Sequence, residues 1–72
     1  MSLSELIVAT GVPWRIEDTV TASGSESDVG DGEKIVGFVV RLRDNRRFQL
    51  RAWRRTDGTF ERPEVMQLPS GL

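Results

Sequence analysis

The sequence has no cysteine and no histidine among its 72 residues. The missing cysteines exclude a disulfide framework, and the two absences together exclude the ordinary zinc sites. A chain of this length forms one domain, residues 1–72, that buries only about 60% of the surface exposed by its unfolded chain. Because disulfides and zinc sites, which stabilise many small domains, are missing, we expect a partner subunit to stabilise the thin core, for example in a homodimer.

Long hydrophobic runs are also missing. No stretch of 18 apolar residues exists, so the sequence predicts no membrane-spanning segment. The first residues lack the basic region, apolar stretch and cleavage site of a signal peptide. We therefore expect a soluble cytoplasmic chain, and the lack of cysteine fits a reducing compartment.

Catalytic signatures are not found either. The chain contains no nucleophile elbow, phosphate loop or dinucleotide fingerprint. The adjacent acids Glu17 and Asp18 would point to opposite faces of a strand, and the acids between Asp28 and Glu33 do not match the spacing of a calcium loop. We predict a protein that is not an enzyme and that needs no cofactor or metal.

Charge is unevenly distributed along the chain. Residues 1–33 carry seven acids against one base, and residues 34–72 carry nine bases against four acids. The formal net charge of -1 therefore hides halves of -6 and +5. Such a split indicates either polyanion binding by the basic half or screening of one half by the other.

The N-terminus has the spacing of a helix start. Ser2 and Glu5 match a capping box, and the apolar residues that follow share one helical face as far as the stop signal at Gly11. We predict a short helix over residues 3–9. The β-branched residues in this segment leave an edge strand as the alternative, because so short a helix has little intrinsic stability.

The pattern changes period after Gly11. Apolar and polar residues alternate over residues 13–22, which predicts a first strand with Trp14 facing the core. Residues 23–33 contain one apolar side chain among serines, glycines and acids, and we expect a mobile acidic loop there. Such a loop could fold over a basic face of its own chain.

The strongest strand patterns cover residues 34–43 and 46–55. To keep like faces together, we predict a three-residue loop, 44–46, between them. That register pairs Leu42 with Phe48, Val40 with Leu50 and Phe38 with Ala52. It also places Gly37 across from Trp53, where the glycine would mark a bulge or a close approach by the indole.

The same register gathers basic and polar side chains on one face of the hairpin. We take this face as the candidate binding site, with these residues: Arg41, Arg43, Arg47, Gln49, Arg51, Trp53 and Arg55. Arginines that contact phosphates, together with an aromatic ring on which bases stack, are typical of single-strand nucleic-acid binding. In the structural alternative, Trp53 is packed and the arginines pair with local acids.

A further turn at Asp57-Gly58 predicts a last strand over residues 59–68, and Pro63 places it at an edge or a bulge. The tail, residues 69–72, is expected to fray. The fold class is therefore α+β or mainly β. A twisted antiparallel sheet of three to four strands is covered by the N-terminal helix or by a second copy of the sheet.

Two segments, Val39-Val-Arg-Leu-Arg-Asp44 and Phe48-Gln-Leu-Arg-Ala-Trp53, resemble the positive cofactor four family of transcriptional coactivators. The resemblance spans about 30 residues, includes the Gly58 turn and Pro63, and implies a twisted sheet that binds single-stranded DNA as a dimer. It implies nucleic-acid contacts for Arg41, Arg43, Arg51 and Trp53. In place of that family's basic leader this chain has an acidic first half.

Nucleic acid is not the only partner that the surface suits. Acidic and basic faces also match a protein of complementary potential, so a small regulator or inhibitor of a larger machine is the alternative. A homo-oligomeric unit is the third hypothesis, because the core is thin and an edge strand is exposed.

Overall fold

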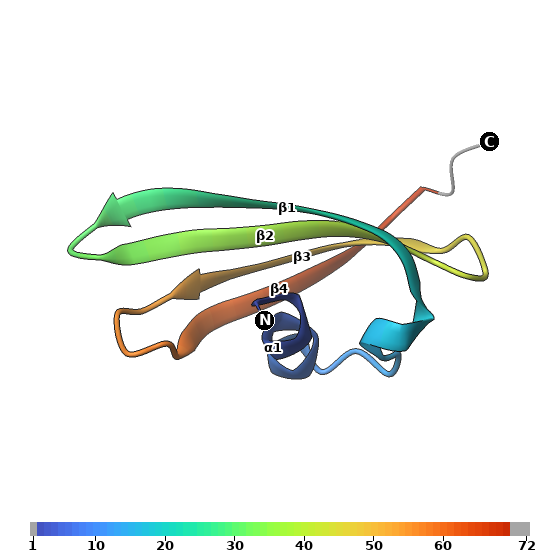
Figure 1. Ribbon diagram of the computed structural model, residues 1–72, viewed down its shortest axis with the longest axis horizontal. Coiled ribbons are helices and arrows are strands. Elements are labelled where there is room, and N and C mark those ends of the chain that lie inside the picture. Colours follow the sequence, from blue (N-terminus) through green and yellow to red (C-terminus); the bar gives the residue numbers. More distant parts are fainter. Residues whose placement is uncertain (1, 70–72) are drawn as a thin grey trace.

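The computed structural model describes residues 2–69 and consists of a short helix packed on one four-stranded antiparallel sheet (Figure 1). The elements are helix α1 (Ser2–Thr10), the 3-10 turn η1 (Ile16–Asp18), and strands β1 (Thr19–Gly30), β2 (Glu33–Leu42), β3 (Arg47–Arg54) and β4 (Phe60–Leu68). The strand order is β1-β2-β3-β4, so every strand pairs with its neighbour in the sequence. The predicted fold class is confirmed.

The N-terminal segment is helical, and the alternative of an edge strand is wrong. The Thr10 hydroxyl donates to the Leu6 carbonyl at 2.9 Å, and the Gly11 N–H donates to the Val8 carbonyl at 3.2 Å. Gly11 has a φ of 71°, the left-handed conformation typical of a residue that ends a helix. The Ser2 side chain of the predicted capping box lies outside the described part of the structure.

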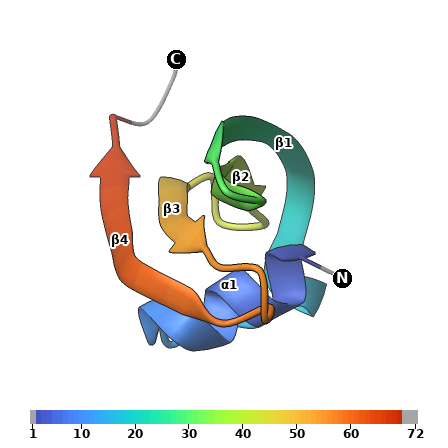
Figure 2. The same ribbon diagram turned by 90° about the vertical axis from the view of Figure 1, so that its left-hand side faces the viewer.

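The core lies between α1 and the helix-side face of the sheet (Figure 2). It is formed by apolar side chains from the helix, the segment that follows it, and the two central strands: Leu3, Leu6, Ile7, Trp14, Val40, Leu42, Phe48, Leu50 and Ala52. Trp14 is buried as predicted, and its ring centroid lies 5.4 Å from that of Phe48. The helix, rather than a second sheet, therefore covers the apolar face.

The predicted strand over residues 13–22 is wrong for residues 13–18, and only residues 19–22 belong to a strand, as the start of β1. The chain instead turns through η1, where the Asp18 carboxylate accepts the Arg15 N–H at 2.8 Å and the Asp18 N–H donates to the Arg15 carbonyl at 3.0 Å. This local turn satisfies backbone groups that a strand would have paired with a neighbour. Pairing with β2 begins only at Thr19.

The predicted acidic loop at residues 23–33 is also corrected. Strand β1 continues to Gly30, and Gly30 faces Glu33 across a two-residue turn at Asp31-Gly32. Both turn residues have positive φ, 55° and 78°, which matches the twist of a hairpin. Backbone pairing with β2 orders the segment although its side chains are exposed.

The β2-β3 register differs from the prediction by two residues. Val40 lies opposite Phe48 and Phe38 lies opposite Leu50. The Leu42 N–H donates to the Arg46 carbonyl at 2.8 Å, so the three loop residues are 43–45. Asn45 takes the left-handed conformation, with a φ of 71°, that ends this type of turn. The shift preserves the faces, because side chains alternate with period two.

The last strand is close to its predicted range and lies at the edge of the sheet, as Pro63 indicated. The register shifts between Arg51 and Trp53, and Arg62 has a φ of 52° beside the proline. Of the predicted frayed tail, residues 70–72 lie outside the described residues. No helix in the described part of the chain is both long and apolar enough to cross a membrane.

Candidate functional site

The face of the sheet opposite α1 carries most of the predicted site, and we call it the outer face. The residues that β2 and β3 contribute from the predicted set are Arg41, Arg47, Gln49, Arg51 and Trp53. Viewed end-on, β1 and β4 rise on either side of β2 and β3, away from the helix (Figure 2). The five side chains therefore line an open face between two edge strands.

Arg43 and Arg55, the other two residues of the predicted site, lie just outside β2 and β3, and each has a hydrogen-bond partner. Arg43 lies in the turn after β2, and its Nε donates to the Glu17 carbonyl at 3.3 Å, toward η1. Arg55 follows β3 and pairs with Glu61, which raises the pKa of the arginine through the hydrogen bond to that carboxylate. The structure thus draws Arg43 away from the outer face and neutralises Arg55.

Arg41 and Arg47 lie directly opposite each other on β2 and β3. Arg41 Nη1 donates to Asn45 Oδ1 at 3.2 Å, and Arg47 Nη1 donates to the Pro69 carbonyl at 3.4 Å. Within residues 2–69 neither guanidinium has a carboxylate within ion-pairing distance. The pair therefore forms a local excess of positive charge. Like charges directly opposite each other in a sheet are also destabilising.

Arg51 has a carboxylate partner. Its Nη2 lies 3.0 Å from Glu64 Oε2 on β4. The two side chains are 56% and 60% exposed, and an ion pair so exposed contributes about 0–1 kcal/mol. The Arg51 guanidinium is therefore free to exchange this partner for another anion at little expense.

Trp53 is half-buried on the outer face, opposite Ile35. Its indole Nε1 donates to Glu33 Oε1 at 3.0 Å. Beside it lies an open hollow of about 250 Å³, which is also lined by Arg51, Arg62 and Glu64. The ring is therefore partly accessible, and it lines a hollow together with two arginines.

A shallow groove runs along the outer face over Gly37. It has a volume of about 110 Å³, with hydroxyls of Ser23, Ser25 and Ser27 on one side and Gln49 and Arg51 on the other. Gly37 pairs with Arg51, not with Trp53 as predicted, and the register is continuous there, so no bulge is present. A Cβ at Gly37 would make only ordinary contacts, the nearest at 3.6 Å.

The acidic segment does not fold over the outer face, although its last residue, Glu33, accepts the Trp53 N–H at the end of that face. It forms β1 beside that face, and its carboxylates Glu26 and Asp28 lie on the helix side of the sheet with Lys34 and Arg54. On the outer face β1 presents serines instead. Sequence reasoning missed these serines and the Glu33 contact, although the alternation of serine at 23, 25 and 27 is a period-two signal.

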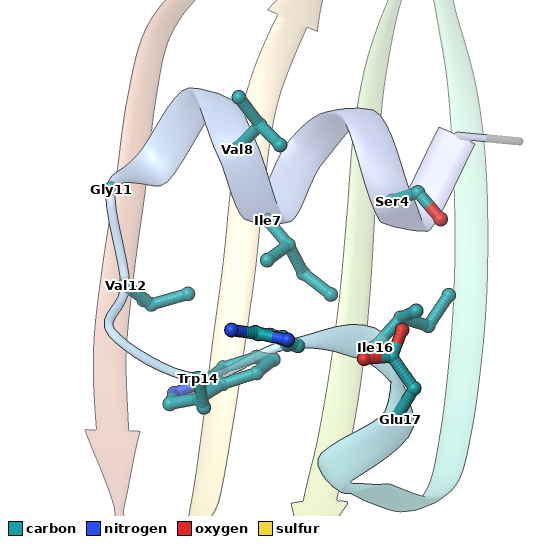
Figure 3. A pocket seen from close by; sticks show the side chains of 9 residues that line it. Ser4, Ile7, Val8, Gly11, Val12, Trp14, Ile16 and Glu17 are labelled. Atoms are coloured by element: carbon teal, nitrogen blue, oxygen red, sulfur yellow. The ribbon is translucent and has the colours of Figure 1, made fainter.

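The helix side has a separate open hollow of about 310 Å³ beneath the end of α1 (Figure 3). Ile7, Val8, Val12, Trp14 and Ile16 line most of it, together with Arg15 and Glu17. The hollow is the exposed margin of the core, and it gathers no converging set of polar side chains.

Among residues 2–69, no group of three or more acids lies close enough together to hold a metal ion.

No family model, curated protein or solved structure matches the chain.

Proposed function

We propose that the protein is a non-catalytic binding module whose outer face binds single-stranded nucleic acid. The observation that carries the proposal is the Arg41–Arg47 pair, two guanidiniums opposite each other without a carboxylate partner in the described residues. A bound phosphate relieves their repulsion and accepts hydrogen bonds from both. The pair is thus suited to an anion that the protein itself does not supply.

Binding through such contacts releases counterions from the nucleic acid. Arg51 lies on the same strand as Arg47, two outward-facing positions further along, and its exposed pair with Glu64 is readily exchanged. Three arginines on one face give a track for successive phosphates. The affinity is expected to fall steeply with added salt.

Base recognition is the role we assign to Trp53 and Gln49. The half-buried indole offers a stacking surface next to the 250 Å³ hollow, and the Gln49 amide borders the groove over Gly37. Bases stack on sheet aromatics when they are splayed out of a strand, whereas duplex edges are read by helices or ribbons in a groove. This arrangement favours a single strand.

The resemblance to the positive cofactor four family points to the same ligand class through Arg41, Arg51 and Trp53.

We place the protein in the cytoplasm on its cysteine-free composition. No catalytic role is assigned to Glu17 or Asp18, since the Asp18 carboxylate is engaged by the Arg15 N–H.

Fluorescence anisotropy with a labelled single-stranded oligonucleotide at low and moderate salt tests the proposal. We expect binding at low salt, and Arg47→Glu should weaken it and lower the salt slope by about one. Arg15→Glu is the matched control, because it makes the same charge change at an exposed position on the helix side. Absence of binding at low salt, or equal losses in both variants, contradicts the proposal.

A second candidate is a module that binds a protein, such as a regulator of a larger machine. The observation in its favour is the pair of exposed apolar side chains, Met66 and Val39, at 58% and 36% exposure, on either side of Gln49. Affinity capture from nuclease-treated lysate separates the two. A partner that survives nuclease and is lost in Met66→Asp favours a protein ligand.

A further inference from the structure

Strand β1 presents an unprotected edge of the sheet. It is 12 residues long, stands first in the strand order, and pairs only with β2 within the described residues. Nearly all of its side chains are exposed, and most are serine, threonine, glycine or alanine. A long edge of this kind, without proline or lysine, is a template for another strand.

The opposite edge of the same sheet is protected. Strand β4 contains Pro63, which has no N–H, and Arg62 in a left-handed conformation at a register shift. Charged side chains of Glu61 and Glu64 flank this irregularity. These features discourage the addition of another strand at β4. The β4 edge is therefore protected from pairing, whereas the β1 edge is not.

The backbone groups that β1 offers can be identified by alternation. The Leu42 N–H donates toward β3, so even-numbered residues of β2 bond to β3 and odd-numbered residues bond to β1. Their partners on β1 are the odd residues Thr21 to Ser27. The N–H and C=O groups of Ala22, Gly24, Glu26 and Asp28 therefore point away from the sheet.

The charges of β1 are already balanced inside the chain. Glu26 lies 3.4 Å from Lys34 Nζ and 3.7 Å from Arg54 Nη2, and Asp28 lies 3.8 Å from Lys34 Nζ. Two carboxylates thus meet two bases on the helix-side face. An edge that is neutral and carries small polar side chains is complementary to a strand of the same character, which the chain itself supplies.

We propose that β1 pairs antiparallel with β1 of a second copy, with Gly24 opposite the same glycine. The Phe38 ring lies over Gly24, close enough to occupy the space of a Cβ. In this register the two Phe38 rings approach each other over the paired glycines and bury apolar surface. Glu26 lies opposite Ala22, whereas pairing centred on Glu26 sets two carboxylates against each other.

The resulting dimer has one continuous eight-stranded sheet. A two-fold axis perpendicular to the sheet keeps both outer faces on the same side, so the two Arg41–Arg47 pairs stand on one surface. The pairing itself depends only on the edge of β1. A failure of the proposed nucleic-acid binding would therefore leave the pairing unaffected, and the reverse also holds.

Sedimentation of the full chain tests the pairing. We expect a mass of twice 8.1 kDa at high micromolar concentration. Ala22→Pro removes an outward N–H and leaves the β1-β2 ladder bonds in place, so it should yield a folded monomer. Gln67→Pro is the matched control, because by the same alternation it removes an outward N–H on the β4 edge, and it should still dimerise. A wild-type monomer, or a dimer lost equally in both variants, overturns the proposal.

Cysteine pairing tests the register without relying on a proline. Ser23 and Ser25 of the two copies face each other as a non-hydrogen-bonded pair, with Cα atoms about 4.5 Å apart, which suits a disulfide. The chain has no native cysteine. A mixture of Ser23→Cys and Ser25→Cys chains should cross-link faster than either variant alone. Faster cross-linking of one variant by itself, or equal rates in all three samples, contradicts the Gly24 register.

Discussion

The indole N–H of Trp53 donates to the carboxylate of Glu33 at 3.0 Å. Glu33 is the last acid of the acidic half of the chain, and Trp53 lies in the basic half. Because β2 carries the glutamate and β3 the tryptophan, the contact fixes the ring at the end of the outer face. It also leaves a negative charge beside the proposed binding site.

Removing this carboxylate should strengthen binding. Glu33→Ala frees the indole and deletes a charge that repels phosphate, so we expect tighter binding of a single-stranded oligonucleotide than in wild type. The Trp53 indole N–H resonance should shift in a ¹H–¹⁵N spectrum, while that of buried Trp14 stays in place. Glu33→Gln retains a hydrogen-bond acceptor and serves as the control for charge alone. Unchanged affinity in both variants contradicts the prediction.

The two glycines of the β1-β2 ladder should respond oppositely to alanine. A Cβ at Gly24 collides with the Phe38 ring, so Gly24→Ala should destabilise the fold by about 1–3 kcal/mol. Gly37→Ala meets only ordinary contacts, and removing a strand glycine should stabilise by about 0.5–1 kcal/mol. Urea denaturation of both variants measures the difference. Destabilisation by Gly37→Ala would show that the fold requires a glycine there.

Truncation in the core should have a much larger effect than truncation on the outer face. Leu50 is 0% exposed beneath α1, and Leu50→Ala should lower the free energy of unfolding by about 2–5 kcal/mol. Val39→Ala, on the neighbouring strand and the opposite face, should change it by less than about 0.5 kcal/mol. Thermal and urea denaturation give both values. Similar losses in the two variants contradict the assignment of faces.

The turn after β3 should contribute to acid sensitivity. The Thr59 hydroxyl, followed by the Thr59 N–H, holds the pKa of Asp57 below its ordinary value. A lowered folded-state pKa gives stability that is present above about pH 4 and is lost as the pH falls through the folded value. Thr59→Val should raise the pKa of Asp57 only part of the way back, because the backbone N–H remains. Carboxyl chemical shifts against pH measure this. No rise in the variant contradicts the assigned cause.

Much of the fold follows from side-chain alternation. The apolar face of residues 36–42 and that of residues 48–52 are the buried faces of β2 and β3, and the helix is where the capping and apolar spacing placed it. These elements were predictable because burial of side chains determines them. The faces of Arg41, Arg47, Gln49, Arg51 and Trp53 followed from the same alternation.

The parts that were not predicted depend on backbone groups. Strand β1 has almost no buried side chain, so its composition resembles a loop, and the signals of a hairpin were the Asp31-Gly32 turn and the alternating serines before it. The shift of the β2-β3 register preserves both faces, so alternation alone does not choose between the two registers. The left-handed Asn45 decides it, and that conformation positions the loop one residue earlier.

Strand order equals chain order in this sheet, and that has a consequence for how the protein folds. Each ladder can form by zipping from the turn between its two strands, because those strands follow each other in the sequence. The step that joins the segments furthest apart in the sequence is the docking of α1 on β3 and β4. We therefore expect the rate-limiting event to be closure of the helix over a sheet that has already begun to assemble.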